Sequence, residues 1–179
     1  MRKAVFWDLL GTLGGSSKTL LPNFDFYNDT LSVLKHVQDS GYIHVIITNQ
    51  SHIAHGRLSL IEYEEHSRRL TEECAKVGVE IKSMYMCPHK KSDNCTCKKP
   101  KPELIYEAKK HLDIDLKHSF IVGDSVNNDM CLANTVGAKG ILVLTGEGKE
   151  GLNNPLTVKP DYVAENLKAA GRIITGRSL

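Results

Sequence analysis

Short apolar runs alternate with amphipathic segments along nearly the whole chain. The run from Lys3 to Trp7 and the β-branched run from Tyr42 to Ile47 predict buried strands. Between them, leucine and valine recur at helical spacing over residues 31–37. The alternation continues, with strands expected at 81–86, 119–122, 140–144 and 161–163 and helices at 60–77, 102–112 and 129–136. Strands that alternate with helices form βαβ units, so the sequence predicts an α/β fold with a parallel sheet covered on both faces.

Length and charge exclude several classes of protein. The 179 residues, with 41% apolar and 25% charged side chains, are typical of one globular domain, so we expect a single domain over residues 1–179. A net charge of +2 does not favour nucleic-acid binding. No apolar run approaches the roughly 18 residues of a membrane span, and the basic N-terminus meets Asp8 too early for a signal peptide. We therefore expect a cytoplasmic monomer or weak homodimer, with neither nucleic acid nor membrane as partner.

Three of the expected strands end directly in polar residues. Asp8 follows the first strand, Thr48 to Ser51 follow the second, and Asp124 follows the strand at 119–122. Ligands bind at the carboxyl ends of the strands in such folds, so we expect these side chains to share one site. Two neighbouring carboxylates repel each other unless a cation or proton lies between them. Oxygen ligands in an open site favour Mg²⁺.

Other residues near this edge supply partners for a phosphate group. Asp129 lies about one helical turn beyond Asp124 and can reach the same cation directly or through water. The hydroxyl and amide of Thr48 and Asn49, with the N–H groups of their segment, can hold phosphate oxygens. Lys98 and Lys99 bring positive charge just before an expected helix. Carboxylates, a cation site and lysines together favour phosphoryl transfer.

Cysteine and histidine cluster in the irregular segment 87–101. Four candidate ligands fall within eleven residues, namely Cys87, His89, Cys95 and Cys97. An odd total of five cysteines, without a secretory signal, argues against a disulfide framework. Three thiolates and one imidazole form the closed tetrahedral set of a structural Zn²⁺ site. Zinc would order this loop and thereby position the two lysines that follow it. The remaining two cysteines, Cys74 and Cys131, fall in helical patterns and are expected to be small buried hydrophobes.

The motifs at the strand ends resemble those of a known superfamily. The segment Asp8-Leu9-Leu10-Gly11-Thr12-Leu13 resembles the first motif of the haloacid dehalogenase (HAD) phosphohydrolases. Thr48, Lys99 and the pair Gly123-Asp124 fit its three further motifs in order. Segments 48–51, 87–89 and 95–102 resemble more narrowly the branch that contains D,D-heptose 1,7-bisphosphate phosphatase and histidinol-phosphate phosphatase. The resemblance covers about residues 3–165.

This resemblance implies a Rossmann-like HAD core with almost no cap domain and a Mg²⁺-dependent phosphomonoesterase acting on a small phosphorylated metabolite, such as a sugar phosphate or histidinol phosphate. Asp8 would attack phosphorus and form an aspartyl-phosphate, while Thr48 and Lys99 would stabilise the phosphoryl group. The Mg²⁺ ligands would be Asp8, the backbone carbonyl of Leu10, Asp124 and, directly or through water, Asp129. Substrate binding would fall to Thr48, Asn49, Gln50, Ser51 and Lys98. The same resemblance assigns zinc to the cysteine and histidine cluster.

The chain departs from the family where a general acid is expected. Leu10 occupies the place of a second aspartate, whose acid–base help is worth roughly 10²–10⁴ in rate. The enzyme would then act on esters with good leaving groups, or use a histidine such as His52 or His55, or be a catalytically impaired phosphate-binding or regulatory protein. Asn128 stands at the usual spacing for the second acid after Gly-Asp, and Asp129 follows it. We expect Asp129 to support the metal.

Two other departures concern the substrate. Lys98 stands where heptose-type members have arginine, and lysine cannot form the bidentate fork of a guanidinium. His52 and His55 stand where those members have glycine and arginine. Both changes disfavour a heptose bisphosphate as the substrate.

Overall fold

The computed structural model describes residues 1–153 and 158–178. Six parallel strands form one sheet in the order β3-β2-β1-β4-β5-β6. The strands are β1 (Ala4–Trp7), β2 (Ile43–Asn49), β3 (Ile81–Cys87), β4 (Phe120–Gly123), β5 (Lys139–Val143) and β6 (Tyr162–Ala164). The chain winds from β1 outward to β3 and then returns to the other side of β1 with β4. The topological switch point, where α/β folds bind their ligands, therefore lies between β1 and β4.

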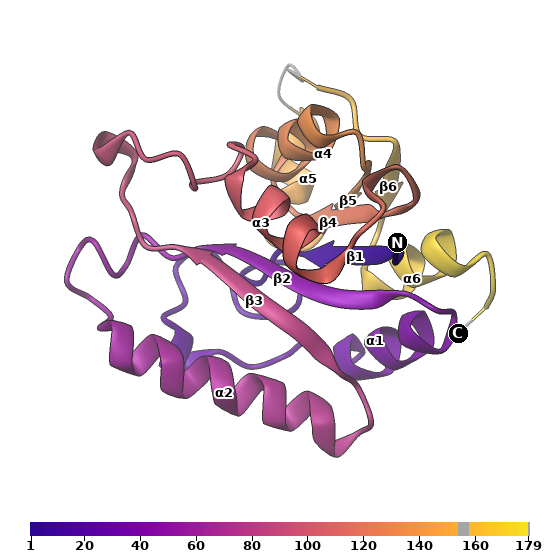
Figure 1. Ribbon diagram of the computed structural model, residues 1–179, viewed down its shortest axis with the longest axis horizontal. Helices are drawn as coiled ribbons and strands as arrows, with labels where there is room; N and C mark the ends of the chain where they lie inside the picture. Colours follow the sequence, from indigo (N-terminus) through magenta and orange to yellow (C-terminus); the bar gives the residue numbers. More distant parts are fainter. Residues whose placement is uncertain (154–157, 179) are drawn as a thin grey trace.

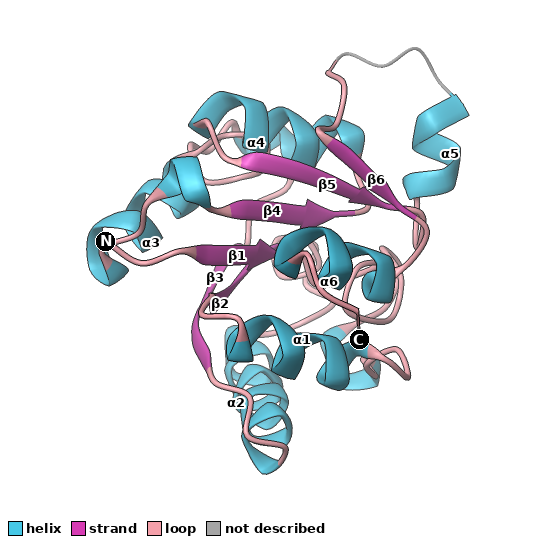
Figure 2. Ribbon diagram, turned by 90° about the vertical axis from the view of Figure 1, so that its right-hand side faces the viewer, coloured by secondary structure: helices cyan, strands magenta, loops and turns pink. Residues whose placement is uncertain are grey.

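Helices cover both faces of this sheet (Figure 1). One face is covered by α1 (Thr30–Asp39), α2 (Leu60–Lys76) and α6 (Leu167–Thr175), and the other by α3 (Glu103–Leu112) and α4 (Cys131–Val136). The short α5 (Gly148–Asn153) packs against β5 and a π-helical turn, η4 (Val126–Met130). Three 3₁₀ turns complete the elements, namely η1 (Leu21–Asn23), η2 (Lys91–Asp93) and η3 (Leu116–His118). Figure 2 shows the arrowheads of β1, β4, β5 and β6 pointing toward the same edge.

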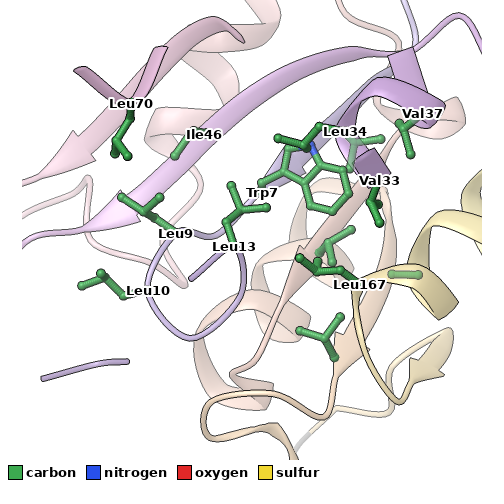
Figure 3. Close-up of a cluster of buried hydrophobic side chains, with 14 of the residues drawn as sticks. Trp7, Leu9, Leu10, Leu13, Val33, Leu34, Val37, Ile46, Leu70 and Leu167 are labelled. Carbon is green, nitrogen blue, oxygen red and sulfur yellow. The ribbon is translucent and has the colours of Figure 1, made fainter. Parts of the chain in front are cut away.

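Side chains of β1 alternate between two hydrophobic cores. Val5 and Trp7 face α1, α2 and α6, and Figure 3 shows Trp7 packed among Leu34, Val33 and their neighbours. Ala4 and Phe6 face α3 and α4. All four β1 side chains are fully buried, because a parallel strand between two helical layers has no solvent face. This confirms the doubly covered sheet expected from the sequence.

Boundaries differ from the expectations in three places. β2 continues through Asn49, so Thr48 and Asn49 end a strand instead of opening a loop. The buried stripe of α2 runs from Tyr63 through Leu70 to Cys74, whereas its first residue, Leu60, is 52% exposed. The helix expected from Asp129 is preceded by the π-helical turn that contains this residue.

The long connection from β1 to α1 carries no additional domain. Between Trp7 and Thr30 the structure places the single short turn η1. This agrees with the nearly capless core that the resemblance implies. Within the described part of the chain, no helix combines the length and apolar character needed to cross a membrane.

Candidate active site and metal-binding loop

The carboxyl edge of the sheet brings the expected polar residues together. Asp8 directly follows β1, Thr48 is the second-last residue of neighbouring β2, and Asp124 directly follows β4 on the other side. The backbone N–H of Asp8 donates to the carbonyl of Val122 at 2.9 Å, which extends the pairing of β1 with β4. With Lys99, these side chains line a small cavity of about 110 Å³. The parallel topology alone accounts for this convergence.

Lys99 lies at the centre of a buried ionic network. Its Nζ donates to Asp8 Oδ1 at 2.6 Å and to Asp129 Oδ1 at 2.7 Å, and its side chain is 4% exposed. Burial by itself lowers the pKa of Lys99, but Asp129 and Asp8 raise it more, so the net shift is upward and the ammonium stays charged. Asn49 fixes the backbone of Lys99: its Oδ1 accepts from the Lys99 N–H at 3.0 Å and its Nδ2 donates to the Lys99 carbonyl at 3.3 Å. Asn49 therefore positions the lysine as well as lining the cavity.

Both oxygens of Asp8 have defined partners. Oδ1 accepts from Lys99, and Oδ2 accepts from the hydroxyl of Thr12 at 3.1 Å. The Asp8 residue is 9% exposed, so it reaches the cavity from a buried position. Thr12 was not singled out from the sequence, although it lies in the same motif four residues after Asp8.

The acids around this cavity are hard to ionise together. Burial, reinforced by the charge of Asp8, raises the pKa of Asp124 to about 7, although a hydrogen bond from the Glu147 N–H at 2.8 Å opposes the rise. Burial and Asp8 likewise raise the pKa of Asp129 to about 6, against the charge of Lys99. One oxygen from each of Asp8, Asp124 and Asp129 lies within 4.8 Å of the others. Such a buried set of hard oxygen ligands fits a divalent cation such as Mg²⁺.

Two glycines let the backbone approach Asp124. A Cβ on Gly11 or Gly146 would lie 2.3 or 1.9 Å from Asp124 Oδ2, so neither position tolerates a side chain. Gly11 also has a φ of +89°, a conformation that favours glycine. The carboxylate of Asp124 is therefore enclosed by backbone from the segments that follow β1 and β5.

Asn128 and Asp129 both lie in the π-helical turn η4. A π turn accommodates one residue more than an α turn, so it brings Asp129 to the position that the family's usual spacing gives to residue 128. Asp129 is 1% exposed, and its Oδ2 accepts from the Ser125 N–H at 3.1 Å. The amide of Asn128 instead donates to the Ser125 hydroxyl at 3.1 Å. Both residues line the cavity, but only Asp129 offers a carboxylate close to Asp8 and Asp124, and its role toward a metal stays a prediction.

The remaining expected site residues differ in whether they line the Asp8 cavity. Gln50 is buried, and its Nε2 donates to Thr48 Oγ1 at 3.1 Å, so it orients this hydroxyl. Lys98 donates to the hydroxyl of Ser51 and to the His89 carbonyl, the latter at 3.2 Å. Leu10 is among the residues that line the cavity. Its hydrocarbon side chain belongs to the buried hydrophobic cluster (Figure 3). The described residues that line the Asp8 cavity do not include Gln50, Ser51, Lys98, His52 or His55.

The cysteine and histidine cluster has the geometry of a tetrahedral metal site. Cys87 Sγ lies 3.6 Å from Cys95 Sγ and 3.7 Å from His89 Nδ1, and His89 Nδ1 lies 3.3 Å from Cys97 Sγ. A zinc ion about 2.3 Å from each sulfur would place two sulfurs roughly 3.8 Å apart, close to these separations. All four ligand atoms lie within 4.8 Å of one another. The residues therefore fit Zn²⁺, with Nδ1 as the histidine ligand.

The two cysteines outside the cluster differ in how deeply they are buried. Cys74 is a buried residue, 1% exposed, and burial raises the pKa of its thiol to about 12, as suits a small hydrophobe. Cys131 begins α4 and is partly buried, so it is less enclosed than expected.

Comparison with known proteins agrees with the motifs. A family model described as HAD-hydrolase-like matches residues 96–170. The D-glycero-β-D-manno-heptose-1,7-bisphosphate 7-phosphatase of Pasteurella multocida is 31% identical over an alignment of 189 positions, gaps included, which covers 98% of each chain. The protein of the same name from Helicobacter pylori is 35% identical over 148 residues, which cover 82% of this chain and 80% of the relative.

A solved structure shows the same fold. The crystal structure of D,D-heptose 1,7-bisphosphate phosphatase from B. bronchiseptica, complexed with magnesium and phosphate, superposes with a TM-score of 0.88 at 26% identity. The match covers 96% of this chain and 97% of that one. This likeness in fold and sequence extends over nearly the whole chain. The chain therefore belongs to the HAD-type phosphatases, in the family that includes the D-glycero-D-manno-heptose-1,7-bisphosphate 7-phosphatases.

Proposed function

We propose that this chain is a Mg²⁺-dependent phosphomonoesterase, a single catalytic domain that hydrolyses a small phosphorylated metabolite through an aspartyl-phosphate on Asp8. The substrate class is a sugar phosphate or a compound of the histidinol-phosphate type. The observation that carries the proposal is the contact of Asp8 with Lys99, beside two further buried acids, at the switch point of the sheet. The heptose bisphosphate phosphatases named above support it as relatives.

The geometry suggests how the phosphoryl group is held. Thr48 Oγ1 already accepts a hydrogen bond from Gln50, so its own proton can be donated to a phosphate oxygen. Lys99, which touches Asp8 and Asp129, can neutralise charge on the transferring group. Mg²⁺ bound by Asp8, Asp124, Asp129 and the carbonyl of Leu10 would add charge stabilisation and orient the phosphate. These residues thus supply positioning and charge, on which phosphoryl transfer depends.

The bonds formed and broken in the two steps indicate which leaving groups the enzyme would favour. An oxygen of Asp8 forms a bond to phosphorus while the ester P–O bond breaks, and the bond electrons stay on the leaving oxygen. The alkoxide of an ordinary alcohol then needs a proton from an acid, whereas a stabilised anion can leave without one. Water then cleaves the aspartyl-phosphate, which gives inorganic phosphate and restores Asp8. Leu10 can provide no proton for either step, so leaving groups that depart without one are favoured.

We also propose that zinc in loop 87–101 has a structural role. Four protein ligands leave no open coordination position, which argues against a catalytic zinc. The last ligand, Cys97, directly precedes Lys98 and Lys99, so fixing this loop also fixes the lysine that contacts Asp8.

A second candidate function rests on Leu10. A protein that binds phosphate at the same residues but turns over poorly, in a phosphate-binding or regulatory role, would need no acid at this position. The two functions differ in turnover and share phosphate binding, so a kinetic experiment separates them.

The test is phosphate release from sugar phosphates, histidinol phosphate and an aryl phosphate, measured with Mg²⁺ and with EDTA. We expect Mg²⁺-dependent release that Asp8→Asn abolishes, with Asp25→Asn, an exposed aspartate outside the cavity lining, as the matched control. Release that persists in Asp8→Asn would refute the nucleophile. No release from any ester, together with saturable binding of inorganic phosphate, would favour the second candidate.

A further inference from the structure

Gln50 is a buried polar residue that lies one position beyond the end of β2. It is 0% exposed and is not among the described residues that line the Asp8 cavity. Its backbone is held on both sides, since the Gln50 N–H donates to the Cys87 carbonyl at 2.7 Å and the Ile53 N–H donates to the Gln50 carbonyl at 3.0 Å. The Gln50 side chain therefore starts from a fixed backbone and does not face a substrate bound at Asp8.

The amide of Gln50 reaches Thr48 because side chains two residues apart on extended backbone lie on the same side. Gln50 Nε2 donates to Thr48 Oγ1 at 3.1 Å, whereas Gln50 Oε1 has no hydrogen-bond partner among the described residues. Thr48 is 1% exposed and lines the Asp8 cavity. Because Thr48 Oγ1 accepts from Gln50, its own proton is left for an acceptor in the cavity.

The unpaired oxygen makes glutamine an unfavourable choice for stability alone. A buried acceptor without a partner costs free energy, and an apolar side chain of similar length would remove that acceptor. Residues that lower stability while serving a reaction are common at functional sites. The single polar contact of the Gln50 side chain with Thr48 therefore indicates what the residue is for.

We propose that Gln50 is a positioning residue for the phosphoryl group, which it does not touch, and that it acts by fixing the Thr48 hydroxyl as a hydrogen-bond donor. This inference rests on the proposed function and deepens it. It gives Gln50 a role other than the substrate contact that the resemblance implies. Without the Nε2 donor the Thr48 hydroxyl can rotate, and its proton is no longer directed toward a phosphate oxygen.

Replacement of Gln50 by methionine separates this role from a structural one. We expect Gln50→Met to lower kcat/KM for an aryl phosphate roughly five- to twentyfold, as for partial loss of one hydrogen bond to a charged group, while the urea midpoint stays unchanged or rises. Gln38→Met is the matched control, because Gln38 Nε2 donates to the Gly78 carbonyl at 2.8 Å and Oε1 accepts from the Glu80 N–H at 2.7 Å. This control should show the opposite pattern, a lower urea midpoint with unchanged kcat/KM.

A double-mutant cycle with Thr48 checks the route of the effect. Thr48→Val removes the hydroxyl, so in that background Gln50→Met should change kcat/KM less than roughly twofold. A loss that persists undiminished in the Thr48→Val background would overturn the proposal, because Gln50 would then act without the hydroxyl. Unchanged kcat/KM in Gln50→Met alone would overturn it as well.

Phosphate binding keeps the proposal testable if hydrolysis is absent. The Kd of inorganic phosphate is measured by titration calorimetry on Asp8→Asn with Mg²⁺ present, with and without Gln50→Met. Weaker binding that disappears as a difference once Thr48→Val is added supports the proposal even when the proposed hydrolysis fails. An equal Kd in the two proteins refutes it and leaves hydrolysis intact. If the methionine variant does not fold, Gln50→Asn takes its place, since its shorter amide no longer reaches Thr48.

Discussion

Replacing Asp124 with asparagine should stabilise the protein in EDTA while abolishing its response to Mg²⁺. Asparagine keeps an oxygen that can accept the hydrogen bond from the Glu147 N–H, so the backbone around Gly146 should not move. The substitution removes a buried negative charge that burial and Asp8 both disfavour. A group that destabilises the fold while holding a ligand is a common source of the trade-off between stability and activity.

The size of the effect follows from the pKa of Asp124, which is raised from 3.8 to about 7. Because a pKa difference of one is worth about 1.4 kcal/mol, ionised Asp124 costs at most roughly 4 kcal/mol above pH 7. Relaxation and water near the cavity reduce this value, so we expect a gain of about 1–3 kcal/mol in the free energy of unfolding at pH 8.

The sign of the pH dependence provides an internal check. The folded protein holds the Asp124 proton more tightly than the unfolded chain, so in EDTA the free energy of unfolding should fall as pH rises from about 4 to about 7. Asp129, with a pKa of about 6, contributes in the same direction over a narrower range. Asp124→Asn should flatten this slope.

Urea unfolding at pH 5 and pH 8, in EDTA and with Mg²⁺, measures these quantities. Wild type should gain stability from Mg²⁺ at pH 8, and Asp124→Asn should gain little. Asp161→Asn serves as a control for loss of an aspartate remote from the site, at the start of β6. Lower stability of Asp124→Asn in EDTA at pH 8 would refute the reasoning that Asp124 is strained when ionised.

Three further outcomes are expected. Cys97→Ser should lower bound zinc below one equivalent by metal analysis, whereas Cys131→Ser should retain it; full zinc retention in Cys97→Ser would contradict the assigned site. Leu10→Asp should raise kcat for alkyl phosphates by about 10²–10⁴ if the missing acid limits turnover, and an unchanged kcat would show that another group supplies the proton. Lys99→Met should lower the free energy of unfolding by about 3–5 kcal/mol in urea, because it leaves two buried carboxylates without their partner; a loss below 1 kcal/mol would argue against the buried network.

The parallel sheet made the main features of the site predictable. Asp8, Thr48 and Asp124 each end a strand, and adjacent parallel strands end at one edge, so their convergence needed no tertiary information. The convergence of the four cysteine and histidine residues was predictable for a different reason. They lie close together in sequence, so their spacing alone restricts the geometry.

The remaining features depend on contacts between distant segments. Lys98 donates to the Ser51 hydroxyl and the His89 carbonyl and does not line the Asp8 cavity, so its expected role in substrate binding stays a prediction. Glu147 reaches the site through the connection after β5, which has no periodic pattern or motif. The position of Asp129 depends on a π-helical turn, a backbone detail that residue spacing does not reveal.

The buried pair of Trp7 and His44 gives the protein an intrinsic optical reporter. Trp7 is the sole tryptophan of the chain, and its indole Nε1–H donates to His44 Nδ1 at 3.0 Å inside the core. His44 Nε2 lies 2.9 Å from the Leu34 carbonyl, which fixes the neutral tautomer with its proton on Nε2, and burial lowers the pKa of His44 to about 4. Fluorescence emission should therefore be blue-shifted and insensitive to pH above about 5, and its red shift should record loss of the sheet. Trp7 immediately precedes Asp8, so its fluorescence reports on the strand that carries the proposed nucleophile, although Trp7 does not itself line the Asp8 cavity.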